Sequence, residues 1–262
     1  MQLRRISVIT AVLLIALFSL TNLLHPLQTA TSAPQAAMLL YDSSLGTLPS
    51  EQNFSWQAFS LQPHFLTLAS QTYSTPVTVF SSTGQLDDYA GYTVSQTVMP
   101  TLSRAAGFQL AFDLRVISEN HGSNNDRAGF SLILLSEDLY GVEMAFWQDE
   151  IWVQEGNGAQ LFTHAEGVPY DTTAALTTYK LTVFNNSYLL VANDALLLSG
   201  SLRQYTDWTP PFGILIDPYE QPNQLFLGDD TSSAGAEVWL GDVTIQDDAL
   251  NQTLLLPIIV NQ

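Results

Sequence analysis

An alternation of apolar and polar residues with a period of two constrains the fold of this chain more than any other feature. It is clearest over residues 107–117, where the apolar positions are Phe108, Leu110, Phe112, Leu114 and Val116. The positions between them hold Gln109, Ala111, Asp113 and Arg115. Successive side chains of a β-strand point to opposite faces, so this pattern predicts a strand with one buried face and one largely polar face.

The alternation recurs over residues 178–183, and two further strands are expected at 188–193 and 195–201. Asn185-Asn186 and Asn193-Asp194 separate these strands, and both residue types tolerate the positive φ of tight hairpin turns. Short apolar runs with turn residues between them recur about every 8–12 residues, as in antiparallel sandwiches. Because no segment has the pattern of a long amphipathic helix, we predict an all-β fold, an antiparallel β-sandwich.

Five segments of this β pattern also resemble a known family. They are residues 179–183, 188–191, 198–203, 225–230 and 237–243. Over roughly residues 40–246 the chain is similar to the laminin-G/pentraxin-like branch of the concanavalin A-like lectin/glucanase superfamily. The resemblance implies a jelly-roll sandwich with curved sheets, one concave face, and a last strand that returns to pair near the first.

The two ends of the chain differ from this body. Residues 1–33 have the pattern of a signal peptide: Arg4 and Arg5, an apolar stretch over 6–24, and small residues at 29–33. We therefore predict an exported protein whose sandwich domain spans residues 34–249; an uncleaved N-terminal anchor is the alternative. Residues 250–262 form a short apolar tail that is too short to span a membrane, so no membrane span is expected after cleavage. An edge strand, a docking strand and a cell-surface anchor all fit this tail.

Composition excludes several function classes. The chain has no cysteine, so disulfide frameworks, thiolate metal sites and cysteine nucleophiles are excluded. Its net charge is -18, and the basic residues after the leader are few and scattered. Nucleic acid and anionic membranes require clustered Lys and Arg, so neither is an expected partner.

The segment 140–155 carries the residues that suit a binding site. We predict a hairpin with a two-residue turn at Asp149-Glu150, which places Trp147 opposite Trp152. One face then holds the core residues Val142, Met144, Phe146, Ile151 and Val153, and the other face holds Glu143, Ala145, Trp147, Trp152 and Gln154. Exposed indoles beside a carboxylate and an amide suit a sugar, and Asp113 and Arg115 would extend that face. The alternative is a structural tryptophan pair, with Arg115 or Arg127 as the counter-charge to Glu143.

An enzymatic interpretation depends on His121, His164 and Glu166. On a regular strand His164 and Glu166 point to the same side, where a histidine and a carboxylate can act as a base. There is no Gly-x-Ser-x-Gly motif, and Ala145 and Trp147 stand where the acidic strand of the superfamily's hydrolases would place carboxylates beyond Glu143. These absences favour a protein that is not an enzyme.

No motif requires a cofactor. Calcium is the cofactor for which the sequence offers candidate ligands. The polar loop 118–127 and the pair Asp229 and Asp230 carry the oxygen ligands that calcium takes. Neither segment has the spacing of an EF-hand loop, and ordinary solvated turns are the alternative.

The function predicted from these patterns is that of a secreted, non-catalytic, lectin-like module. It would bind glycan or another extracellular ligand on a concave sheet face, through Asp113, Arg115, Arg127, Glu143, Trp147, Trp152, Gln154, His164 and Glu166. Two alternatives remain: a structural or adhesive component of a cell surface, and a polysaccharide hydrolase or lyase.

Overall fold

The computed structural model describes residues 36–60, 66–210 and 217–247, which form two antiparallel β-sheets. The eight-stranded sheet has the order β13 (Ala195–Ser201), β12 (Ser187–Ala192), β11 (Thr177–Phe184), β6 (Phe108–Asn120), β15 (Gly235–Asp247), β4 (Val77–Ser81) and β3 (Ser70–Ser74), with β1 (Met38–Tyr41) paired to β15. The seven-stranded sheet has the order β10 (His164–Pro169), β9 (Glu150–Gln154), β8 (Gly141–Phe146), β7 (Ser131–Leu135), β14 (Leu225–Asp229), β5 (Asp88–Val94) and β2 (Phe54–Ser60). Three short 3-10 helices are described: η1 (Ser43–Leu45), η2 (Pro49–Glu51) and η4 (Pro218–Glu220).

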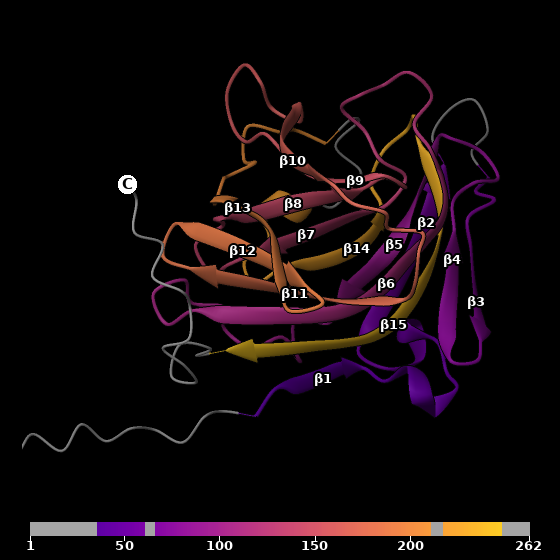
Figure 1. The fold of residues 1–262 in the computed structure, drawn as a ribbon, viewed down its shortest axis with the longest axis horizontal. Helices are drawn as coiled ribbons and strands as arrows, with labels where there is room; N and C mark the ends of the chain where they lie inside the picture. Colours follow the sequence, from indigo (N-terminus) through magenta and orange to yellow (C-terminus); the bar gives the residue numbers. More distant parts are fainter. Residues whose placement is uncertain (1–35, 61–65, 211–216, 248–262) are drawn as a thin grey trace, which may run out of the picture. The chain divides into compact units, whose positions relative to one another are not determined.

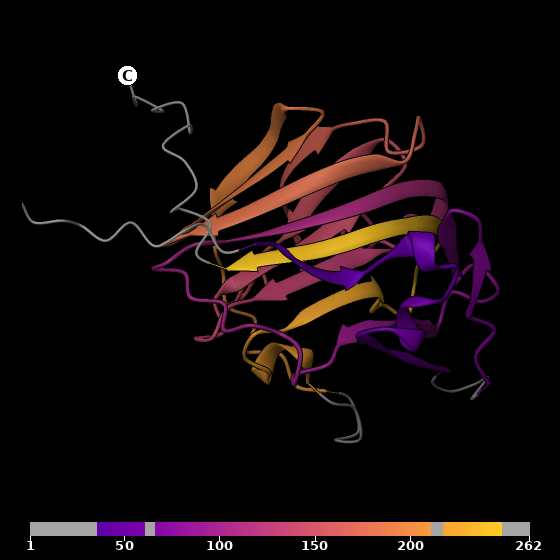
Figure 2. The ribbon, with the colours of Figure 1, turned by 90° about the horizontal axis from the view of Figure 1, so that it is seen from below.

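The two sheets lie face to face as two layers (Figures 1 and 2). The chain changes sheet repeatedly, as at β4 to β5, β6 to β7, β10 to β11 and β14 to β15. The last strand, β15, pairs with the first, β1, and also with β4 and β6. The predicted antiparallel jelly-roll β-sandwich is therefore confirmed, including the return of the last strand to the first.

Alternating side chains build the core between the layers. In β6 the predicted apolar positions Phe108 to Val116 are buried against residues of the opposite sheet, while the positions between them face outward. The predicted core face of β8 and β9, from Val142 to Val153, lies in the same core. The hairpin β11–β12 turns at Asn185, with a φ of 51°, and β12–β13 turns at Asn193 and Asp194, with φ values of 50° and 59°.

The predictions for residues 1–33 and for the tail 250–262 lie outside the described residues. No helix in the described ranges is long and apolar enough to cross a membrane.

Candidate functional site

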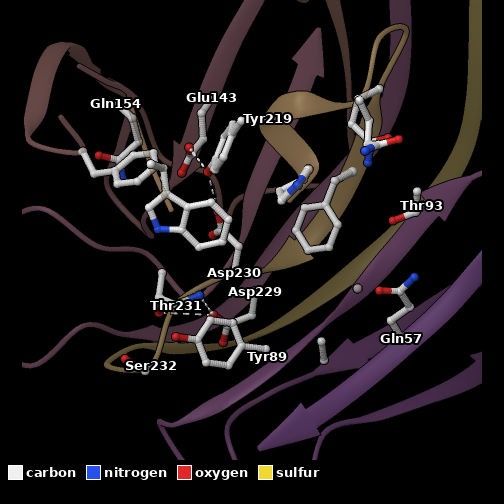
Figure 3. A pocket seen from close by; sticks show the side chains of 18 of the residues that line it. Gln57, Tyr89, Thr93, Glu143, Gln154, Tyr219, Asp229, Asp230, Thr231 and Ser232 are labelled. Carbon is white, nitrogen blue, oxygen red and sulfur yellow. Dashed lines mark hydrogen bonds between the residues drawn. The ribbon is translucent and has the colours of Figure 1, made fainter. Parts of the chain in front are cut away.

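A groove with a volume of about 600 Å³ lies across the outer face of the seven-stranded sheet (Figure 3). This face carries the residues that alternate with the core positions: Glu143 on β8, Gln154 on β9 and Phe226 on β14. Strands β2 and β5 add Gln57, Phe59, Tyr89, Gly91 and Thr93. The groove is therefore a product of strand alternation on the face that does not form the core of the sandwich.

The floor of the groove depends on a glycine. A Cβ atom at Gly91 would come within 2.5 Å of the ring of Phe226 and 2.7 Å of the carbonyl oxygen of Leu227. The Phe226 ring can therefore lie over β5 only because residue 91 has no side chain. Next to it, Phe59 and Tyr89 are opposite each other on β2 and β5, and their rings stack with centroids 5.1 Å apart.

A second aromatic group forms the other side of the groove. Phe162, Trp208 and Tyr219 come from loops and from η4, and they cover Ile133, Leu135 and Tyr205 on the outer face of the sheet. The loops are joined by Asn157, whose side chain oxygen accepts a hydrogen bond from the backbone N–H of Asp207 at 2.9 Å. Asp217 caps η4 by accepting a hydrogen bond from the N–H of Tyr219 at 2.8 Å, and this cap fixes Tyr219 in place.

Two carboxyl groups converge on Tyr219 (Figure 3). The Tyr219 hydroxyl donates to Oε2 of Glu143 at 2.6 Å and lies 3.3 Å from Oδ2 of Asp230. Burial and the neighbouring Asp230 carboxylate raise the pKa of Glu143 well above its usual range. Burial also raises the pKa of Asp230, although a hydrogen bond from Glu143 and the charge of Arg127 oppose that rise. Of the two carboxyls, Glu143 therefore favours its protonated form more strongly than Asp230 does.

Other polar groups of the groove are only partly satisfied. The Gln154 amide is buried; its Nε2 donates to the carbonyl oxygen of Asp126 at 3.2 Å, and its Oε1 accepts no hydrogen bond from a described residue. Asp229 is fully buried, and its Oδ1 accepts from the N–H and the hydroxyl of Thr231 at 3.0 and 3.2 Å. Burial raises the pKa of Asp229 well above its usual range. Such a site is rich in hydrogen-bonding groups without being strongly charged.

Comparisons with known proteins place the chain by fold alone. No protein-family model matches it, and the curated proteins contain no match. Among solved structures it is similar to a carbohydrate esterase from the Shiga toxin-encoding bacteriophage phi24B, with 11% identity and a TM-score of 0.48 over 81% of this chain and 99% of that one. It is also similar to the alginate lyase A1-II' (9%, TM-score 0.44, 73% and 94% covered) and to a Bacillus subtilis protein of unknown function with a galectin-like fold (9%, 0.44, 82% and 98%). These similarities are too distant to assign a function to the chain.

The expected exposed tryptophan platform is wrong, because Trp147 is 8% exposed and Trp152 is fully buried. The turn of the hairpin is at Gln148 and Asp149, so Trp147 lies opposite Glu150 and Trp152 opposite Ala145. This shift of two residues keeps every side chain on its predicted face. The loop before β7 covers the indoles: the carbonyl oxygen of Arg127 accepts a hydrogen bond from Nε1 of Trp147 at 2.8 Å.

Two histidines complete the cover over the indoles. The ring of His121 stacks on Trp147 at 4.1 Å, and that of His164 stacks on Trp152 at 4.2 Å. Neither indole therefore offers an open face to a ligand, and the tryptophan pair is a structural cluster, the alternative that the sequence left open.

The structure separates His164 from Glu166, which were expected on one side of a strand. A bulge between His164 and Gly167 shifts the register of β10 against β9. His164 consequently faces Trp152 and Glu150, whereas Glu166 accepts hydrogen bonds from Tyr188 and Arg203. Although burial opposes it, these two donors lower the pKa of Glu166, which makes it a structural ion-pair partner.

Asp113 and Arg115 do not extend the groove, because β6 belongs to the eight-stranded sheet. Asp113 accepts a hydrogen bond from the Thr178 hydroxyl at 2.6 Å. Arg115 donates to the carbonyl oxygen of Thr173 and lies over the ring of Trp239. Among the other predicted ligand residues, Arg127, Glu143 and Gln154 line the groove together with Asp229 and Asp230.

Asp229 and Asp230, the candidate calcium ligands, lie at the end of β14, and the loop 118–127 uses several of its oxygens internally. Asn120 and Asn124 accept hydrogen bonds from the N–H groups of Gly122 and Asp126. Within the residues that the structure describes, no group of three or more His, Asp or Glu side chains is arranged to hold a metal ion.

The sequence did not single out the aromatic residues of the groove, which are Phe59, Tyr89, Phe162, Trp208, Tyr219 and Phe226. One signal was available in β5, where Tyr89, Gly91 and Thr93 alternate with the core residues Ala90, Tyr92 and Val94. The loop residues have no such pattern.

Proposed function

We propose that this chain is a secreted, non-catalytic module that binds carbohydrate in the groove of the seven-stranded sheet. One observation carries the proposal: aromatic side chains and amides line a single groove of about 600 Å³. Aromatic faces cover the C–H patches of a sugar ring, while amides donate to and accept from its hydroxyls. Five of these aromatic residues are half-buried, so part of each ring is open to a ligand: Phe59, Tyr89, Phe162, Trp208 and Phe226. Tyr219 is 3% exposed and packs beneath them.

A glycan array probed with the full chain, with and without calcium, tests the proposal. We expect glycan binding that quenches tryptophan fluorescence, because Trp208 lines the groove. Trp208→Ala should weaken the binding of each array ligand by about tenfold or more, as expected for an aromatic anchor that contributes more than ~1 kcal/mol.

Trp239→Ala is the matched control, since Trp239 lies on β15 in the opposite sheet. It should leave the affinity unchanged. Array ligands that bind Trp208→Ala and Phe226→Ala as tightly as the wild-type chain would show that the groove is not the binding site.

A polysaccharide hydrolase or lyase is the second candidate, favoured by the convergence of Glu143, Tyr219 and Asp230 in the groove. Glycosidases place their two carboxyls roughly 5 Å or more apart, on either side of the scissile bond. Here the hydroxyl of Tyr219 donates to Glu143 and lies 3.3 Å from Oδ2 of Asp230, and Glu143 is only 2% exposed. This geometry suits hydrogen bonding better than attack on a sugar.

Incubating the chain with the glycans that it binds separates the two functions. We expect neither new reducing ends nor unsaturated products, as measured by end-group assay and mass spectrometry. Product formation that is lost in Glu143→Gln and kept in Asp113→Asn would replace the binding proposal with an enzymatic one.

A further inference from the structure

The groove contains little positive charge. Among the lining residues that the structure describes, Arg127 is the only Lys or Arg, whereas Glu143, Asp229 and Asp230 are acids. Nη1 of Arg127 is already used, because it donates to the carbonyl oxygens of Asp126 and Phe162. Among the described lining residues, a ligand carboxylate would therefore meet one arginine, part of whose hydrogen-bonding capacity is already used, and three acids.

The groove also presents acceptors that lack donors. The buried Oε1 of Gln154 accepts no hydrogen bond from a described residue, and the bond from Nε2 to Asp126 fixes the orientation of the amide. Oδ1 of Asp230 is buried as well and accepts no hydrogen bond of standard geometry from a described residue, although the neighbouring Ser131 hydroxyl lowers the pKa of Asp230. Buried acceptors of this kind are costly unless a donor reaches them. A sugar hydroxyl can donate to them, whereas an ionised carboxylate only accepts and cannot.

The remaining polar residues described in the groove carry no charge. They are Gln57, Thr93, Gln96, Gln154, Gln221, Gln224, Thr231 and Ser232. Their amides and hydroxyls both donate and accept, so they can match the hydroxyls of a neutral sugar in either role. The net charge of the whole chain, -18, acts in the same direction by repelling polyanions before contact.

We propose that the groove selects neutral glycans and rejects polymers whose sugar units carry carboxylates. Gln154 and Asp230 are the residues that discriminate between the two kinds of sugar. The inference rests on the proposed carbohydrate binding and adds the substrate class to it. Rejection has two parts: long-range repulsion, which salt screens, and a local mismatch of acceptor against acceptor, which salt does not remove.

Matched pairs of polymers test the proposal, because each pair changes charge and keeps the backbone. Suitable pairs are methyl-esterified and de-esterified homogalacturonan, and hydroxyethyl- and carboxymethyl-cellulose, with mannan and laminarin as further neutral probes. We expect the full chain to bind the neutral member of a pair roughly tenfold or more tightly than the acidic one, in affinity electrophoresis or calorimetry. Part of the preference should remain at high salt.

Two variants locate the selectivity. Asp230→Asn removes a carboxyl of the groove and should reduce the ratio of the affinities for the neutral and acidic members several-fold. Asp113→Asn removes a carboxylate from the outer face of the opposite sheet and should leave the ratio unchanged. An equal effect of the two variants would show that net charge alone discriminates, which would overturn the role given to Asp230.

Different outcomes would overturn the selectivity for neutral glycans and the proposed carbohydrate binding. Binding of the acidic polymers that equals or exceeds binding of their neutral partners would overturn the inference and leave carbohydrate binding standing. Failure to bind any of the polymers, together with an array that yields no ligand, would overturn the proposed function itself.

Discussion

Replacing Trp152 with alanine is expected to lower the free energy of unfolding by about 3–5 kcal/mol, the range for large-to-small changes at buried aromatic positions. The indole is fully buried between Trp147 and His164, with ring centroids at 5.3 and 4.2 Å. Removing it leaves a cavity at a point where two strands and the loop before β7 meet. Urea denaturation followed by far-UV circular dichroism measures the loss.

Trp208→Ala is the matched comparison, because Trp208 is half-buried at the groove. It should cost much less stability than Trp152→Ala and should affect glycan binding instead. A small stability loss in Trp152→Ala accompanied by weaker glycan binding would contradict the structural role of this indole and restore it as a binding platform.

The alternation in the sequence predicted the strands and their core faces, because strand geometry ties each side chain to one of two faces. It also predicted which face Glu143 and Gln154 occupy, even though the pairing register of the hairpin is shifted by two residues and its turn by one from the expected position. A shift of two residues leaves faces unchanged, and a shift of one would have exchanged them. Facing away from the core, however, is not the same as being exposed to solvent. The loop that carries His121 and Arg127 covers the tryptophans, and nothing within residues 140–155 encodes that cover.

The groove was predicted only in part for a related reason. Glu143 and Gln154 could be found because they alternate with core residues, but their partners come from distant segments. Tyr219 lies 76 positions after Glu143 in the chain, on a 3-10 helix of three residues. Contacts of this kind are set by the topology of the sandwich, and a local pattern cannot show them.

The Glu143–Asp230 pair predicts a pH-dependent stability that differs from that of an ordinary acidic protein. A carboxyl whose pKa is higher in the folded state binds more protons there than in the unfolded chain. Its contribution to stability is therefore fully present below the unfolded value, near 4.5 for Glu143, and is lost as the pH rises through the folded pKa. Asp229 and Asp230 act in the same direction.

The acids with lowered pKa values do not change the pH dependence of stability between pH 5 and pH 7. Asp138 has its pKa lowered to about 2 by hydrogen bonds from Arg104 and Ser136, although burial opposes them. Hydrogen bonds from Arg203 lower the pKa of Glu155, and Glu166 is also lowered. Their contributions are lost only as the pH falls below about 4, so they are constant from pH 5 to pH 7.

Glu143→Gln should accordingly remove one of the ionisable groups that make the stability of the folded chain depend on pH. The amide can accept the hydrogen bond from Tyr219 and donate one to Asp230, so the contacts of the pair survive. The other groups that face residue 143 are Arg127 and Tyr205, whose hydroxyl accepts a hydrogen bond from the backbone N–H of that residue. As the pH rises from 5 towards the folded pKa of Glu143, the wild-type chain should lose stability more steeply than the variant, with a difference in slope of at most about 1.4 kcal/mol per pH unit.

Urea titrations at half-unit pH steps measure this difference in slope, and Glu137→Gln, which removes an exposed carboxylate, is the control. The control should follow the wild-type slope. The variant should be at least as stable as the wild-type chain at pH 7, because it no longer has a buried acid to ionise. Equal slopes in Glu143→Gln and in the wild-type chain would mean that Glu143 is ionised in the folded protein at pH 5, which would contradict the raised pKa of this carboxyl.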